Sequence, residues 1–189
     1  MLSLSQSNSL SLNLGIKTNN SSNRQRLRKF LQFQLGKEIE STTSESKVDR
    51  ALLEAELVTE IITISPTEIL PVPQMLYCIL GIYSWRSEML WIVDLENLLG
   101  YPSPLFSEAT APEAESLMVM VVQFQGQALG LVVSAVDHIV QLDLEEFKSP
   151  SPELFANDVL PFLSSYFTSS QNEIIMLLDT AEIFHFFNL

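Results

Sequence analysis

A segment near the middle of the chain recurs in pattern close to its C-terminal end. Residues 87–94 have the sequence SEMLWIVD, and residues 172–179 have the sequence NEIIMLLD. Glutamate and aspartate coincide, and all five positions between them are apolar in both copies. A repeated unit indicates that the chain folds as two similar parts.

Two shorter repeats occur in the same order along the chain. They pair Gln32-Phe33-Gln34 with Gln123-Phe124-Gln125, and Val58-Thr59-Glu60-Ile61 with Val136-Asp137-His138-Ile139. The three repeats together predict two similar halves, at about residues 30–100 and 117–187, each a small antiparallel barrel.

Patterns typical of strands make up much of the remaining sequence. They cover residues 30–35, 57–64, 118–124 and 128–136, and Gly126 between the last two predicts a hairpin turn. Residues 101–116 contain three prolines and three acids, which predicts a linker.

The two predicted halves differ by one polar segment. Phe33 and Glu60 are 27 positions apart, whereas Phe124 and His138 are 14 apart, a difference of 13. The segment 37–50, KEIESTTSESKVDR, has about this length, and we expect it to be an exposed insertion in the first half.

Both copies of the long repeat end in an aspartate. Asp94 precedes LENLLG and Asp179 precedes TAEIF. An aspartate that leaves a strand can accept the free amide hydrogens of a following helix, so we expect both to be helix N-caps. Asp179 and Glu182 have capping-box spacing, and Gly100 suits a helix C-terminus.

Charge is divided unevenly along the chain. Residues 1–29 carry five bases and no acid, whereas the other 160 residues carry 23 acids and five bases, which gives −18 and a total of −13. So acidic a body repels a phosphate backbone, which argues against nucleic-acid binding as its main role. No apolar run reaches the length of a membrane helix, so we expect a soluble body.

Two further features concern compartment and the N-terminus. The single cysteine, Cys78, lies in an apolar run and predicts a buried thiol in a reducing compartment, hence a cytoplasmic protein. Residues 1–28 are rich in serine, asparagine and leucine and predict a flexible tail; their basic, acid-free composition also loosely fits a transit peptide.

Catalytic and cofactor patterns are weak. Neither His138 nor His185 has metal-ligand spacing, and no glycine-rich phosphate loop occurs. Ser134, Asp137 and His138 are the residue types of a hydrolytic triad, but close neighbours on a strand point to opposite faces. We therefore expect no enzyme and no cofactor.

Arg86 is the remaining candidate for a functional side chain. It stands in the short polar interruption Arg86-Ser87-Glu88 between two apolar strands, in a body with only four other bases. It is either an ordinary surface charge, solvated or paired with Glu88, or an arginine that recognises a partner. The residues alone leave both open.

The region around Arg86 resembles the signature of CheW-like chemotaxis adaptors. In that pattern a glycine is followed, after a few residues, by Arg-Gly, an apolar strand and Asp-Leu. The matching residues are GIYSWRSEMLWIVDL at 81–95 followed by Leu98-Leu99-Gly100, Phe30–Gly36, Val58–Ile61, Pro71–Pro73 and the pair of strands between Gly130 and Val140. The version with two tryptophans around the arginine is similar to adaptors of phototactic, pilus-driven photosynthetic bacteria.

The resemblance covers residues 29–189 and implies a mainly β fold of two five-stranded SH3-like barrels with short helices. It implies a non-enzymatic adaptor in chemotaxis, phototaxis or pilus motility. Its partners would be the regulatory domain of a CheA-type histidine kinase and the cytoplasmic tip of a methyl-accepting receptor. Val58, Glu60 and Arg86 would lie near those contacts.

The chain departs from the family pattern at three places. Ser87 replaces the glycine that usually follows the arginine, Ser134 stands where aspartate is frequent, and the 37–50 insertion is unusual. Two alternatives remain, a small-molecule-binding or hydrolytic β-barrel and a regulatory fragment of the kinase itself. A deep pocket lined by convergent polar groups would favour the first of these.

Overall fold

The computed structural model describes residues 27–36, 48–101 and 116–188. In this part of the chain the strands are β1 (Leu27–Leu35), β2 (Asp49–Glu54), β3 (Val58–Ile64), β4 (Ile79–Trp85), β5 (Glu88–Asp94), β6 (Leu117–Phe124), β7 (Gln127–Val133), β8 (Ala135–Asp143), β9 (Leu163–Thr168) and β10 (Ile174–Leu178). Two α-helices, α2 (Leu95–Leu98) and α3 (Thr180–Phe186), follow β5 and β10. Short 3₁₀ turns are η1 (Ala55–Leu57), η2 (Pro66–Glu68), η3 (Leu144–Glu146) and η4 (Leu160–Phe162). None of these helices is long and apolar enough to span a membrane.

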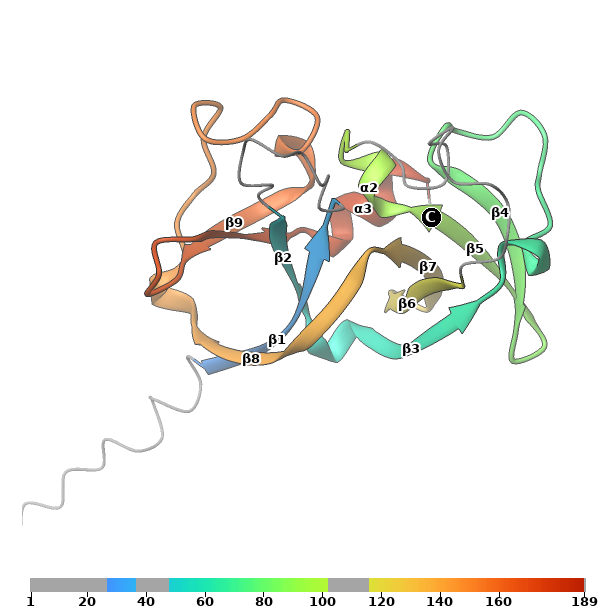
Figure 1. Cartoon of the computed structure of the whole chain (residues 1–189), viewed down its shortest axis with the longest axis horizontal. Coiled ribbons are helices and arrows are strands. Elements are labelled where there is room, and N and C mark those ends of the chain that lie inside the picture. Colours follow the sequence, from blue (N-terminus) through green and yellow to red (C-terminus); the bar gives the residue numbers. More distant parts are fainter. Residues whose placement is uncertain (1–26, 37–47, 102–115, 189) are drawn as a thin grey trace, which may run out of the picture.

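The strands form two five-stranded sheets. Sheet A has the order β8-β1-β2-β10-β9, and sheet B has the order β3-β6-β7-β5-β4. Figure 1 shows sheet A on the left and sheet B on the right, with α2 and α3 between them. The expected mainly β architecture of two five-stranded units is confirmed. The pairing is not wholly antiparallel, because β2 pairs with β10, and β5 with β7, in parallel.

Neither sheet is built from one half of the sequence. Sheet A takes β1 and β2 from the N-terminal part and β8, β9 and β10 from the C-terminal part, whereas sheet B is continuous from β3 to β7. The expectation that each half forms its own barrel is therefore wrong. Because the N-terminal strands join the C-terminal ones, β2 lies between β1 and β10. Both of its edges are hydrogen-bonded and neither is left open.

The strand register supports the long repeat. Trp91 of β5 lies opposite Leu129 of β7, and Met176 of β10 lies opposite Ala51 of β2. Trp91 and Met176 occupy the same position in the repeats 87–94 and 172–179. If five is added to each strand number of sheet B, and the count returns to β1 after β10, the result is the order of sheet A. The two sheets therefore correspond strand by strand.

The same register tests the two shorter repeats. Val58 of β3 pairs with Val122 of β6, and Val136 of β8 pairs with Phe33 of β1. Val122 in turn lies opposite Leu129, and Phe33 lies opposite Ala51, the two residues that face the equivalent positions Trp91 and Met176. The repeat that aligns Val58 with Val136 is therefore confirmed. The repeat that aligns Phe33 with Phe124 is wrong by two residues, because Phe33 corresponds to Val122.

Each sheet closes into a barrel through one backbone bridge. In sheet B, Leu70 follows η2 and exchanges two hydrogen bonds of 2.8 and 2.9 Å with Ile82 of β4. In sheet A, Lys148 follows η3 and exchanges two of 2.8 and 2.9 Å with Tyr166 of β9. The chain thus uses the same turn and the same closing contact in both barrels.

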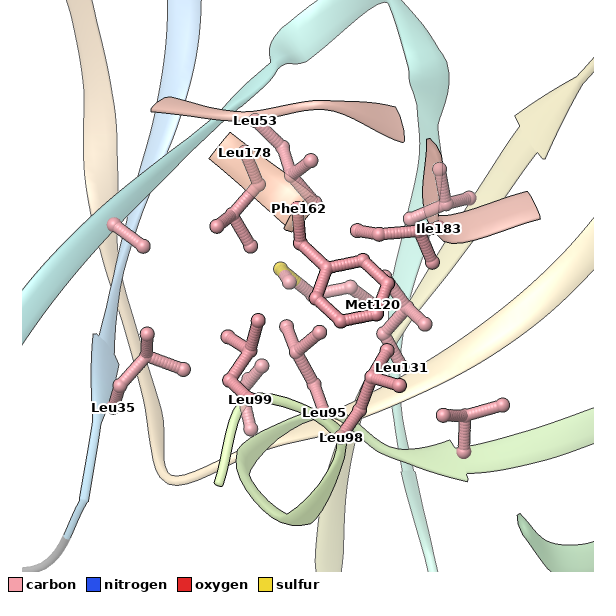
Figure 2. Close-up of a cluster of buried hydrophobic side chains, with 14 of the residues drawn as sticks. Leu35, Leu53, Leu95, Leu98, Leu99, Met120, Leu131, Phe162, Leu178 and Ile183 are labelled. Atoms are coloured by element: carbon pink, nitrogen blue, oxygen red, sulfur yellow. The ribbon is translucent and has the colours of Figure 1, made fainter. Parts of the chain in front are cut away.

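The apolar side chains form three clusters. One lies within sheet B around Ile92, Val119 and Val121, and a smaller one lies within sheet A around Phe30 and Leu52. The largest, the shared core, lies between the barrels. Figure 2 shows Leu95, Leu98 and Leu99 of the α2 region facing side chains of both sheets, among them Leu35, Leu53, Met120, Leu131 and Leu178. Successive residues of the central strands alternate between a barrel interior and the shared core, so both faces are buried.

Both aspartates cap the helices that follow them, as expected. Asp94 Oδ1 accepts a hydrogen bond of 3.0 Å from the Asn97 amide. Asp179 Oδ1 accepts bonds of 3.0 and 3.2 Å from the amides of Ala181 and Glu182. Gly100 has φ +79°, which suits its predicted place after α2. The Glu182 carboxylate, expected to complete a capping box, instead lies 3.7 Å from Nδ1 of His185.

Two predicted boundaries need correction. β1 begins at Leu27, inside the predicted tail 1–28, and β2 begins at Asp49, inside the predicted insertion 37–50. Leu27 pairs with Asp143, and Asp49 pairs with Leu35, so ladder hydrogen bonds outweigh the polar composition of these segments. Residues 1–26, 37–47 and 102–115 lie outside the described part of the chain, so the tail, most of the insertion and the linker remain predictions.

Candidate functional site

The candidate site begins with the turn between β4 and β5. Trp85 pairs with Glu88, which leaves Arg86 and Ser87 as the two central residues, with φ +49° and +67°. Positive φ at both positions is the type I′ turn, whose twist matches that of the two strands it joins. Ser87 therefore adopts the left-handed conformation that a glycine would adopt without cost, and the turn is kept despite the substitution.

Arg86 packs against two side chains at this turn. Its Nη2 donates a hydrogen bond of 2.7 Å to Glu60 Oε2, and its guanidinium carbon lies 5.0 Å from the centroid of the Trp85 ring. The Trp85 indole N–H donates to the other carboxylate oxygen, Glu60 Oε1. We call Glu60, Trp85 and Arg86 the tip cluster.

The electrostatics of the tip cluster favour a charged glutamate. The Trp85 hydrogen bond, and then the bond and positive charge of Arg86, hold the pKa of Glu60 below its ordinary value, although burial opposes them. The stability that this pairing gives the folded state is present above the pKa of Glu60 in the unfolded chain. It is lost as pH falls through the lower pKa of Glu60 in the folded protein. At neutral pH the Arg86 side chain is thus oriented by an anion and an aromatic face.

Arg86 also remains open to a partner. Its side chain is 62% exposed, compared with 27% for Glu60. A guanidinium has five N–H donors, of which Glu60 receives one, so the rest of the fork can reach an incoming carboxylate or carbonyl. Of the alternatives left open by the sequence, pairing of Arg86 with Glu88 is not the one observed, because Arg86 pairs with Glu60.

Val58 is placed differently from the other two predicted residues. It lies two residues before Glu60 on β3, but a bulge separates the pair, and its partly buried side chain packs against the shared core. The structure therefore brings Glu60 and Arg86 together and turns Val58 toward the interior.

Sequence reasoning missed Trp85 as a member of this site. It is 7% exposed and packs with the core of sheet B while its indole nitrogen reaches Glu60. The only signal was a tryptophan directly before the arginine at the end of a strand, which an apolar pattern treats as core. Two apolar side chains on neighbouring strand positions are exposed, Ile61 at 45% and Met89 at 80%.

Sheet A carries a different polar group at the corresponding end. Asp137 accepts hydrogen bonds from Gln32 (3.0 Å) and Gln34 (2.7 Å), and Arg50 lies 3.7 Å from Asp137 and 2.9 Å from Glu173. We call these five residues the polar cluster. Its members satisfy one another across β1, β2, β8 and the start of β10.

The hydrolytic triad does not assemble. The Ser134 hydroxyl is buried, His138 is exposed, and the Asp137 carboxylate receives the two glutamine amides in place of a histidine. Within the described ranges, no three His, Cys, Asp or Glu side chains are grouped so as to hold a metal ion.

Two surface hollows are relevant to the small-molecule alternative. One of about 290 Å³ is lined mainly by apolar residues, among them Leu99, Phe155 and Met176, and its polar groups Asp49 and Tyr101 hydrogen-bond each other at 2.8 Å. The other, of about 670 Å³, is an open depression over the polar cluster. The first is mainly apolar and the second is wide open to solvent, whereas a specific ligand site is a well-formed cleft with a few converging polar groups.

Comparison with known proteins gives a family and several solved structures of similar fold. The family described as CheW-like domain matches residues 30–187. The scaffolding protein TtCheW from Thermoanaerobacter tengcongensis has a similar crystal structure, with a TM-score of 0.61 and 18% sequence identity over 80% of this chain and 88% of that one. No curated protein matches the sequence.

Proposed function

Because the chain belongs to the CheW-like domain family, we propose that it is a non-enzymatic adaptor that couples a chemosensory receptor to a CheA-type histidine kinase. Its two SH3-like barrels would act as a rigid scaffold in the cytoplasm. The receptor would contribute its cytoplasmic tip, and the kinase its own CheW-like regulatory domain. The single observation that supports this role most strongly is the exposed, oriented arginine of the tip cluster.

Orientation is what makes Arg86 suited to recognition. An arginine that is already held in place by Glu60 and Trp85 loses less side-chain entropy on binding than a free one. Arginine and tryptophan are also among the residue types enriched in binding hot spots. We therefore assign Arg86 the direct contact and Glu60 its positioning. Val58 would act indirectly, because its partly buried side chain packs against the shared core at the start of β3.

The test uses Arg86→Ala with Lys148→Ala as a matched control. Lys148 is also a base over an aromatic ring, 5.8 Å from the centroid of Tyr166, but it belongs to sheet A. Binding of purified protein to the kinase regulatory domain and to a soluble receptor fragment is measured separately by calorimetry. We expect Arg86→Ala to weaken at least one affinity by about tenfold or more, which is about 1.4 kcal/mol. Lys148→Ala should leave both unchanged.

The same variants separate recognition from stability. Arg86 is mostly exposed, so Arg86→Ala should change the free energy of unfolding by less than about 1 kcal/mol. Arg86→Glu should weaken binding further, because it places a negative charge beside Glu60. A large loss of stability with unchanged affinity per folded molecule would reassign Arg86 to the fold and remove the main support for this proposal.

A further inference from the structure

α2 contains a glutamate that the partner-binding surface does not use. Glu96 is 1% exposed, and neither carboxylate oxygen has a hydrogen-bond partner. The Ser134 hydroxyl, also buried, has none either. Buried polar atoms without partners are rare in native proteins, and each calls for a physical explanation.

The position of Glu96 is at the seam between the two barrels. The residues that face its carboxyl are Ser134, the single residue between β7 of sheet B and β8 of sheet A, and Gly36 at the end of β1. α2 itself follows β5 of sheet B and packs into the shared core. The carboxyl therefore lies where the chain crosses from one sheet to the other.

The charges around Glu96 oppose its ionised form. From β5, Asp94 adds a second negative charge nearby, and β7, with the sequence QALGLVV, has no titratable residue. After α2 comes Tyr101, whose hydroxyl donates to Asp49 of β2. Ser134 and the amides of Gly36 and Ser134 face the carboxyl and favour its charged form, but none reaches hydrogen-bonding geometry.

Burial outweighs the effect of these polar groups on the Glu96 carboxyl. Desolvation is the largest influence and raises the pKa of Glu96 above 4.5. An ionised carboxylate in this place would need water, a cation or a rearranged backbone. A neutral carboxylic acid needs much less. The corresponding position in α3 is Ala181, so the other barrel avoids the problem.

We propose that Glu96 is held as a neutral carboxylic acid in the seam between the barrels, and that its ionisation releases α2 and the β7–β8 connection. The device goes beyond the adaptor role and does not depend on it. Its sign follows from proton linkage. The folded state binds the proton more tightly than the unfolded state, so the stability it contributes is complete below pH 4.5 and is lost as pH rises through the folded pKa.

α2 is tied to a natural reporter of such a release. The Asn97 side-chain amide donates to the Tyr77 carbonyl at 3.1 Å, and the Asp94 amide donates to the Cys78 carbonyl at 2.8 Å. Cys78 is the only cysteine, is fully buried in the shared core, and burial raises its thiol pKa to about 11. Movement of α2 should expose this thiol to reagents.

The first test compares melting temperatures of the wild type and Glu96→Gln from pH 5 to pH 9. Glutamine has nearly the shape of the protonated acid and cannot ionise. We expect Glu96→Gln to raise Tm at pH 8 by about 3 to 5 °C for each unit by which the folded pKa exceeds its ordinary value, with the difference becoming smaller toward pH 5. Glu146→Gln, an exposed glutamate of η3, removes the same charge and should shift Tm by less than about 1 °C at every pH.

The second test measures the rate at which Cys78 reacts with a thiol reagent under native conditions. The rate is divided by that of the unfolded chain at the same pH. This division removes the change in rate that comes only from the fraction of thiol ionised at each pH. Protection in the wild type should fall as pH rises, and protection in Glu96→Gln should not. This measurement uses the wild type as well, so it remains decisive if the variant fails to fold.

Two results would overturn the proposal. One is a lower Tm for Glu96→Gln across the whole pH range, which would mean that an ionised carboxylate is required in the seam. The other is Cys78 protection that is independent of pH in the wild type.

Discussion

The two barrels repeat one another in everything that builds a barrel and differ in what they present at one end. Both have the same strand order, the same closing bridge after a 3₁₀ turn and an aspartate cap, which follows β5 in sheet B and β10 in sheet A. At the end that carries the β4–β5 turn, sheet B has the tip cluster with an exposed arginine. At the corresponding end, beside the β9–β10 turn, sheet A has the polar cluster, in which Arg50 is paired with two acids.

This difference distinguishes two kinds of structural feature in one chain. Features that recur in both barrels are those that packing and hydrogen bonding demand of the fold. A feature found in one barrel alone is not explained by the demands that the two barrels share. The tip cluster belongs to the second kind, which is why we place the partner contact there.

The largest expected break in the correspondence is at Gly81. It has φ +146°, and a Cβ added there would lie 2.3 Å from the Leu70 carbonyl oxygen, at the bridge that closes sheet B. Its counterpart in sheet A is Ser165, at the same bulge. Gly81→Ala should therefore destabilise the protein by about 2 to 5 kcal/mol in urea denaturation, because the strain and the clash add.

Ser165→Ala is the matched control and should cost less than about 1 kcal/mol. If Gly81→Ala were tolerated equally well, the closing bridge of sheet B would be adaptable and the two barrels would be equivalent at that point.

A smaller effect tests a feature that the barrels share. Asp94→Ala and Asp179→Ala should each cost about 1 to 2 kcal/mol, because each removes the acceptor that caps a helix. The asparagine variants keep an acceptor and should lose about half as much or less. Both are measured by urea denaturation. A loss at one site more than twice that at the other would show that the two caps do not have the same role.

The smallest effect concerns the turn that carries Arg86. Ser87→Gly should stabilise the protein by about 0.5 kcal/mol, because glycine relieves the left-handed conformation but is more flexible when unfolded. The β6–β7 turn, with Gln125 and Gly126 also at positive φ, gives the reverse experiment, since Gly126→Ala should destabilise by about 1 kcal/mol. Thermal melts measure both. Destabilisation by Ser87→Gly would mean that the serine side chain supports the turn.

Much of this fold follows from the sequence because the repeated strands carry their pattern openly. β5 and β10 are continuous apolar runs that end in a capping aspartate, and this combination predicted both the strands and the helices after them. Residue patterns did not predict β2, β9 or most of β8, because the predicted strand 128–136 reaches only the first two residues of β8. β2 contains Ala51, Leu52 and Leu53 before an acid, a composition suited to helices, and it is a strand because β1 and β10 pair with both its edges.

The site was predicted in part. Arg86 stood out because charge is rare between two apolar strands, and Glu60 followed from the family resemblance. Their contact joins residues 26 positions apart and depends on the closure of sheet B, which no local pattern encodes. The pairing of β1 and β2 with the C-terminal strands in sheet A could not be predicted for the same reason. The repeats show which strands are equivalent, but they do not show which strands pair with each other.

The pairing of N-terminal with C-terminal strands in sheet A also determines the order in which the two sheets can form during synthesis. The strands of sheet B lie consecutively from Val58 to Val133, so the ribosome has delivered all of them before any of β8, β9 or β10 exists. β1 and β2 emerge first and must wait while residues 55–134 are made, which takes about 4 to 16 s at bacterial and eukaryotic rates of translation. During that interval two apolar strands have only each other and the forming sheet B as partners. We expect sheet B to be the first body that the nascent chain completes, and sheet A to close only when the C-terminal strands return to the N-terminal ones.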